Sequence, residues 1–199
     1  MAWLILQEKG YIFIRYLFSI FNRLVSNDYE TVMHAGQAII TRAKIPSLYS
    51  NYSRYLAGLN IEKELFGYRF KSPITFAAFE AHFDSIRFWI ELGCGGGCLK
   101  TIKQHFSEGN DRPRVNQIRY KGNEHLLNAL GLPGPGIRQF LRNLEKEQLT
   151  YDVPIGLSIG GNSIEEYQAV IQESIPVIGK YLKSPYVELN ISCPNTNTG

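Results

Sequence analysis

The first part of the chain shows a helical pattern of apolar residues. Residues 11–25 are strongly apolar, and their few polar side chains fall on one narrow stripe of a helix. A second helix is predicted to begin at Asn27 or Asp28, which are suitable capping residues, and to end before Pro46. The pattern therefore predicts an apolar helical hairpin over residues 1–45.

The apolar surface of this hairpin has more than one interpretation. Crossing a bilayer takes roughly 20 apolar residues, whereas the run over residues 11–25 is shorter and contains Arg15. No small-residue cleavage site follows a charged start, so the segment does not match a secretion signal. Its apolar face either packs on the rest of the chain, or forms a peripheral membrane anchor or an entrance for an apolar substrate. The sequence favours neither interpretation.

From residue 70 onward, short apolar runs alternate with helical patterns, and this alternation predicts parallel β/α units. The predicted strands cover residues 73–78, 93–100, 154–160 and 186–192. The predicted helices cover residues 83–92 and 136–147 and a segment that follows the capping-box pair Ser163 and Glu166 and breaks near Pro176. Residues 103–125 are polar and predicted to be irregular. Four glycines in residues 93–100 disfavour a strand unless another backbone approaches closely.

The number of units limits the possible architectures. About four β/α units follow the hairpin, whereas a closed (β/α)₈ barrel needs eight strands and typically about 250 residues. The sequence ends in a polar loop, residues 195–199, just after a predicted strand rich in polar motifs. A small open α/β sheet and the first half of a barrel both fit, and the second is favoured. We thus expect the hairpin over residues 1–45 and half of a barrel over residues 46–199.

The composition and charge of the chain indicate its broad class of protein. The chain is 44% hydrophobic and 20% charged, which is typical of a globular protein. Lys and Arg number 21 and Asp and Glu 18, and this balance, without a basic cluster, argues against a nucleic-acid partner. Cys94, Cys98 and Cys193 are too few for a disulfide scaffold and fit a reducing compartment such as the cytoplasm. No Cys and His pairs occur at zinc-ligand spacing.

Polar residues gather where the predicted strands end. Lys100 and Thr101 follow the Gly-rich run, Ser158 is near the end of the third strand, and residues 190–196 end the fourth. The carboxyl ends of parallel strands carry the reactive loops of such folds. Asn side chains beside a Lys and a Cys suit a planar, anionic, imide-like ligand. Taken one at a time, each residue also has an ordinary role as a solvated cation, a cap or a packing thiol.

The combination resembles the dihydroorotate dehydrogenase family. Residues 189–196, Leu-Asn-Ile-Ser-Cys-Pro-Asn-Thr, are similar to its Asn-(Val/Ile/Leu)-Ser-(Ser/Cys)-Pro-Asn signature, and residues 109–114 to its Gly-Asn-Pro-x-Pro-Arg segment. Residues 128–133 look like its Asn-x-Met-Gly-Leu-Pro substrate loop, and Lys100-Thr101 like the Lys-Ser/Thr pair of its soluble class. The resemblance implies an FMN-binding (β/α)₈ barrel, of which this chain is the N-terminal half and inactive by itself.

The resemblance also implies a reaction and the residues for it. The family oxidises dihydroorotate to orotate with FMN in de novo pyrimidine (UMP) biosynthesis. Cys193 would be the base that removes a proton from C5, while the C6 hydride goes to FMN N5, and Lys100 would contact flavin and substrate. The implied substrate-binding residues are Asn128, Gly131, Leu132, Asn190 and Asn195. The implied flavin-binding residues are Ala77, Ala78, Lys100, Thr101, Ser158 and Asn190.

Features of two classes of the family are mixed. Cys193 and Lys100 resemble the soluble class, whereas the N-terminal hairpin resembles the membrane-associated class that reduces quinones. The electron acceptor is therefore a quinone or a soluble acceptor, and a homo-oligomer is left open. Phe79 stands where the family has Gly and is expected to crowd the backbone approach to the flavin. The alternatives are another FMN-barrel oxidoreductase acting on pyrimidines, or an inactive homologue with only an attachment role.

Overall fold

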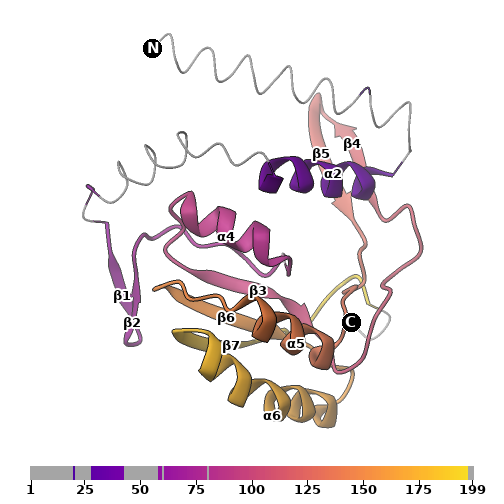
Figure 1. The fold of residues 1–199 in the computed structure, drawn as a ribbon. Coiled ribbons are helices and arrows are strands. Elements are labelled where there is room, and N and C mark those ends of the chain that lie inside the picture. The colour runs from indigo at the N-terminus through magenta and orange to yellow at the C-terminus, as the bar shows by residue number, and fades with distance from the viewer. Residues whose placement is uncertain (1–19, 21–27, 43–57, 60, 80, 197–199) are drawn as a thin grey trace. The chain divides into compact units, whose positions relative to one another are not determined.

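A computed structural model describes residues 20, 28–42, 58–59, 61–79 and 81–196 (Figure 1). The chain divides into two compact units. The first unit comprises Met1–Arg42 and Asn110–Leu130, and the second comprises Ala43–Gly109 and Gly131–Gly199. The first predicted helix of the apolar hairpin lies almost wholly outside the described residues. Among the described helices, none is long and apolar enough to cross a membrane.

The first unit contains helix α2 (Tyr29–Arg42) and an antiparallel hairpin of β4 (Val115–Tyr120) and β5 (Asn123–Asn128). The predicted start of α2 is confirmed, because Asp28 Oδ1 accepts a hydrogen bond from the Glu30 backbone N at 3.0 Å. The prediction that residues 103–125 are irregular is wrong for residues 115–125, which form this hairpin, whereas residues 103–114 contain no helix or strand beyond an isolated bridge at Ser107. Lys121 and Gly122 both have positive φ, 47° and 80°, as a tight hairpin turn requires.

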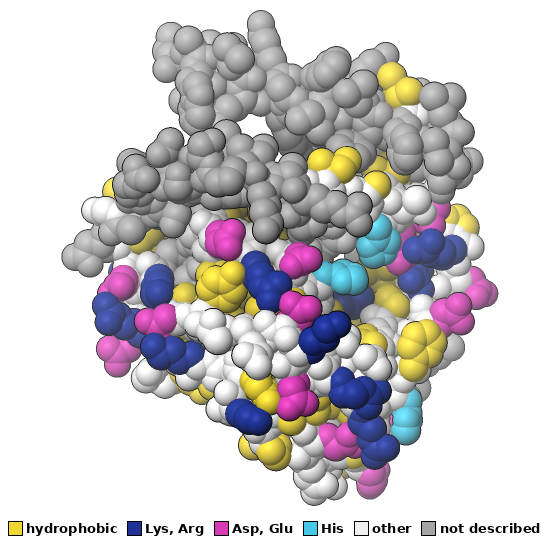
Figure 2. Space-filling model, in the orientation of Figure 1, with side chains coloured by type: hydrophobic (Ala, Val, Ile, Leu, Met, Phe, Trp, Pro, Cys, Tyr) yellow, Lys and Arg dark blue, Asp and Glu magenta, His cyan; other side chains and the backbone are white. Residues whose placement is uncertain are grey.

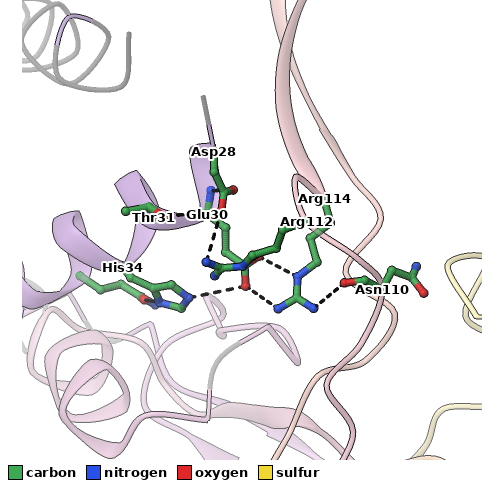
Figure 3. A network of polar contacts seen from close by, with 8 residues as sticks. Asp28, Glu30, Thr31, His34, Asn110, Arg112 and Arg114 are labelled. Carbon is green, nitrogen blue, oxygen red and sulfur yellow. Dashed lines mark hydrogen bonds and ion pairs between the residues drawn. The ribbon is translucent and has the colours of Figure 1, made fainter. Parts of the chain in front are cut away.

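A buried ion-pair network joins α2 to this hairpin within the first unit (Figure 3). The Glu30 carboxylate is 5% exposed and accepts two hydrogen bonds from Arg114, each 2.7 Å long. Arg112 Nε lies 3.2 Å from the same carboxylate, and Arg114 Nη1 donates to the Asn110 carbonyl at 3.0 Å. The hydrogen bond from Arg114 is the main reason that the pKa of Glu30 falls to about 2, although burial opposes it.

The second unit is built on a parallel sheet in the order β3 (Gly97–Ile102), β6 (Pro154–Ile159), β7 (Ser184–Leu189). This order confirms the predicted parallel β/α units. The strand predicted over residues 73–78 is reduced to a single parallel bridge between Phe76 and Gly97. A second short hairpin, β1 (Lys63–Leu65) with β2 (Tyr68–Phe70), was not predicted at all.

The Gly-rich strand begins at Gly97, later than the predicted Gly93, and its glycines are there because another backbone passes close by. A Cβ on Gly95 would lie 2.1 Å from the carbonyl oxygen of Ser72, and a Cβ on Gly97 would lie 2.4 Å from the ring of Phe76. Residues with side chains would push the 72–76 segment away from β3. The expected close approach is thus confirmed.

Three helices cover the core side of this sheet: α4 (Phe83–Glu91), α5 (Ile137–Glu147) and α6 (Ile164–Tyr181) (Figure 1). The predicted capping of α6 is confirmed, because Ser163 Oγ accepts from the Glu166 backbone N. The predicted break near Pro176 is wrong. Val170 and Ile178 are buried in the same cluster on either side of Pro176, so packing keeps both halves of the helix in place.

One buried cluster holds the sheet and its helices together. It includes Leu99 and Leu157 from the strands, Phe140 from α5 and Ile86 from α4. In contrast to this core, the surface drawn in Figure 2 carries Lys and Arg side chains interspersed with Asp and Glu. That mixture agrees with the weak net charge of +3.

Candidate functional site

An irregularity in β3 shapes the edge of the sheet where the site lies. Leu99 pairs with Leu157 and Ile102 pairs with Ile159, so β3 contains one residue more than β6 between these two pairs. The extra residue is a β-bulge, a feature that commonly redirects side chains beside active sites. Leu99 and Ile102 both stay in the core, and the side chain of Thr101 is turned away from it.

A chain of polar side chains crosses the three parallel strands at this edge. Thr101 Oγ1 and Ser158 Oγ lie 2.9 Å apart, and Asn190 Nδ2 donates to Thr101 Oγ1 at 2.9 Å. Thr101 is 3% exposed and Ser158 is 0% exposed. Three of the residues that the family resemblance assigns to the flavin are therefore brought together.

The contact between Thr101 and Ser158 leaves one hydroxyl hydrogen without a partner among the described residues. Thr101 and Ser158 carry two hydroxyl hydrogens, and only one of them can lie between the two oxygens. Within the part of the chain that the structure describes, the other hydrogen has no acceptor. Because a buried unsatisfied hydroxyl costs about 1–3 kcal/mol, this arrangement points to a ligand that accepts a hydrogen bond here.

Main-chain hydrogen bonds also fix the position of Asn190. The backbone N of Asn190 donates to the carbonyl of Ile159 at 2.9 Å, and its backbone carbonyl accepts from the hydroxyl of Tyr167. With Nδ2 bonded to Thr101, Oδ1 is the polar atom of Asn190 left to accept from a ligand. No sequence motif assigns a role to Tyr167, because this contact depends on where α6 lies relative to the end of β7.

A cavity of about 290 Å³ opens beside this chain of side chains. Its walls come from the loops that follow β3, β6 and β7, together with the start of α6. Among the described residues it is lined by Lys103, Leu132, Gly160, Gly161, Asn162, Ser163, Ile164, Tyr167, Asn190, Ile191, Ser192, Cys193 and Thr196. The predicted residues Asn190, Leu132 and Cys193 thus share one cavity at the carboxyl ends of parallel strands, where reactive groups are expected.

Cys193 lies in a hydrogen-bonded turn that lines the cavity. Its thiol is free and half-buried. Its backbone carbonyl accepts from the backbone N of Thr196 at 3.1 Å and from Thr196 Oγ1 at 3.0 Å. Asn195, also half-buried, lies within the same turn.

The predicted substrate loop is split between the two units. Gly131 and Leu132 belong to the second unit and have positive φ values of 71° and 54°, so the loop makes a left-handed bend next to the cavity. Asn128 belongs to the first unit, where it pairs with Val115 at the end of the β4–β5 hairpin.

The remaining predicted residues lie on or before β3. Lys100 is half-buried on the strand, Ala78 is half-buried and Ala77 is exposed. Phe79, which replaces the family's Gly, is 51% exposed and sets its ring edge-on to Trp89 of α4, with centroids 6.2 Å apart. The backbone of Phe79 is not in the left-handed region that demands glycine. Its effect on flavin binding stays a prediction.

The region that carries these motifs is similar to known proteins. Residues 60–199 match the family model described as Dihydroorotate dehydrogenase. The catalytic subunit of dihydroorotate dehydrogenase B (NAD(+)) from Pyrococcus furiosus is 34% identical over 139 residues, covering 69% of this chain and 42% of the relative. Dihydroorotate dehydrogenase (quinone) from Nostoc punctiforme is 30% identical over 142 residues, covering 69% of this chain and 37% of the relative. The match spans less than half the length of each relative.

A solved structure supports the fold. The crystal structure of DHODH from Eimeria tenella, in complex with ferulenol, matches with a TM-score of 0.65 at 18% identity, covering 91% of this chain and 48% of that one. This similarity shows a shared mixed α/β fold. Since the family model covers well over half of the chain, the chain belongs to the dihydroorotate dehydrogenase family.

Proposed function

We propose that this chain is the N-terminal half of an FMN-dependent dihydroorotate dehydrogenase, which oxidises dihydroorotate to orotate in pyrimidine biosynthesis. The strands would form the first part of a (β/α)₈ barrel. Two observations support this: the parallel order β3-β6-β7 along the sheet, and a match that covers 48% of the similar DHODH chain. Loops at the carboxyl ends of such strands carry the active site in this architecture.

The residues present fit a flavin. Thr101 and Ser158 offer a buried hydroxyl hydrogen without an acceptor among the described residues, and a flavin ring carries carbonyl and nitrogen acceptors that would satisfy it. Asn190, Lys100 and the segment at Ala77 and Ala78 would complete the contact. When bound, FMN supplies the acceptor for the hydride that leaves C6 of dihydroorotate.

The substrate would bind in the cavity between these side chains and the Cys193 loop. Asn190 Oδ1 can accept from a ring N–H of the pyrimidine, and Asn195 would supply a further amide. The left-handed bend at Gly131 and Leu132 would present backbone groups to the same ring.

Cys193 would be the base that removes the proton from C5. A thiol has an unperturbed pKa closer to neutrality than a hydroxyl does, so it reaches its reactive form at lower pH. Its turn is fixed by two hydrogen bonds from Thr196, which would hold the sulfur in one place relative to the substrate.

The electron acceptor would be a quinone or a soluble acceptor, because the relatives include both an NAD(+) and a quinone enzyme. We further propose that the protein is cytoplasmic and that residues 1–45 make a peripheral contact with a membrane. A homo-oligomer is proposed as well.

The observation that carries the proposal is the polar chain Thr101–Ser158–Asn190 beside the cavity lined by Cys193. The test is the visible spectrum of the whole protein that contains this chain as its N-terminal half, isolated as its cells make it, followed by anaerobic addition of dihydroorotate. We expect a flavin spectrum that dihydroorotate bleaches and that dihydrouracil, which lacks the carboxylate, does not. A protein without flavin would refute the proposal, and bleaching by dihydrouracil alone would favour a different pyrimidine oxidoreductase.

A further inference from the structure

Lys103 is a charged residue of the cavity that neither the motifs nor the family resemblance assigns. It follows the last residue of β3 and lines the same cavity as Asn190 and Cys193. Ile102 is buried in the core, and successive side chains alternate along an extended segment, so Lys103 is directed to the opposite side, with Thr101. The Lys103 carbonyl accepts from the backbone N of Ile137 at 2.9 Å, which anchors this position against α5.

The described lining of the cavity carries a positive charge and no negative one. Lys103 is the one Lys, Arg, Asp or Glu among the described residues that line it, and the other walls are amides, hydroxyls, a thiol, glycines and aliphatic groups. Within the described part of the chain, the structure shows no ion pair of Lys103 with a carboxylate. Glu166, at the start of α6, accepts from the backbone N of Asn162 at 2.7 Å and does not line the cavity.

We propose that Lys103 binds the carboxylate of the pyrimidine ligand and selects carboxylated over neutral pyrimidines. This inference rests on the proposed function, and it concerns a different lysine from Lys100. Lys103 is half-buried, and a cation there attracts an anion more strongly than one on an open surface. A charge-assisted hydrogen bond from an ammonium to a carboxylate is also stronger than a neutral one.

The test compares two ligands that differ mainly in the carboxylate. Orotate and uracil are titrated into the protein isolated as above and into its Lys103→Gln, Lys103→Arg and Lys146→Gln variants, with heat or flavin fluorescence as the signal. Lys146, exposed on α5 and away from the cavity, is the matched control. We expect Lys103→Gln to weaken orotate binding about tenfold while uracil binding stays within about twofold. Lys103→Arg should retain most of the orotate affinity, and Lys146→Gln should retain all of it.

The outcomes separate this inference from the function on which it rests. If wild-type protein binds orotate no more tightly than uracil, the proposed function fails, and the role of Lys103 with it. If wild-type protein prefers orotate but Lys103→Gln keeps that preference, Lys103 is a solvated surface cation and only the inference is overturned. Equal weakening of both ligands by Lys103→Gln would also overturn it, because it would show a structural effect.

Discussion

Replacing Glu30 with Gln tests the ion-pair network that holds α2 on the β4–β5 hairpin. The substitution keeps the shape of the side chain but removes the negative charge between Arg112 and Arg114. Arg114 is itself buried, so the variant leaves a buried cation without its counter-ion. Breaking a buried pair in this way typically costs about 3–5 kcal/mol.

The lowered pKa of Glu30 also indicates how much the ionised carboxylate stabilises the fold, and at which pH this stabilisation is lost. The hydrogen bond from Arg114 lowers this pKa from 4.5 to about 2, and a shift of that size is worth about 3 kcal/mol at about 1.36 kcal/mol per pKa unit. A lowered pKa means that the folded state favours the ionised carboxylate. The stabilisation is therefore fully present above about pH 4.5 and is lost as the pH falls towards 2.

The pH-dependent stabilisation of α2 is measured by hydrogen exchange of its backbone amides, detected by mass spectrometry, from pH 7 down to pH 2.5. In wild-type protein we expect the free energy of opening to fall by about 3 kcal/mol across the acid range, and in Glu30→Gln to be lower already at pH 7. Glu124→Gln, on the same hairpin but facing solvent beside Arg119, should match wild type. Equal protection of α2 in wild type and Glu30→Gln at pH 7 would show that the charge of Glu30 does not stabilise α2.

Three further substitutions test the sheet, the α6 helix and the site. Gly156→Ala would place a Cβ 2.2 Å from the ring of Tyr186, so it should lower the free energy of unfolding by about 1–3 kcal/mol in urea titrations. Gly179→Ala, a helical position with nothing within 4 Å, should leave stability unchanged or raise it by up to about 1 kcal/mol; the reverse order of the two variants would contradict the packing described. Tyr167→Phe removes the hydroxyl that holds the Asn190 carbonyl, so it should slow dihydroorotate-dependent flavin reduction severalfold with a stability loss of only about 1 kcal/mol. An unchanged rate would mean that Tyr167 does not position Asn190.

The elements that sequence predicts well are those with a strong apolar period. The helix predicted over residues 136–147 is observed as α5, and the strand over residues 154–160 as β6, because each buries a continuous face. The β4–β5 and β1–β2 hairpins were missed because most of their residues are exposed, so no alternation of apolar residues marks them. The local sign was a glycine in each turn, Gly67 and Gly122, at positive φ.

The site was predictable in part. Thr101, Ser158 and Asn190 were expected from the family motifs, and the structure joins them by hydrogen bonds. The bulge in β3 could not be predicted, since it depends on how Leu99 and Ile102 both reach the core. Tyr167 and Lys103 were missed for a similar reason: their contacts depend on where α6 and the end of β3 lie in space.

Anaerobic stopped-flow flavin reduction measures whether Cys193 is the base that removes a proton from dihydroorotate in this cavity. The rate is measured per bound flavin in wild type, Cys193→Ala and Cys193→Ser. We expect Cys193→Ala to keep its flavin but lose at least about 100-fold in rate, and Cys193→Ser to keep some activity with its optimum at higher pH, because a hydroxyl is the weaker acid. Equal rates in all three proteins, with only a stability loss of about 1 kcal/mol in the alanine variant, would show that Cys193 is a packing residue and not the base.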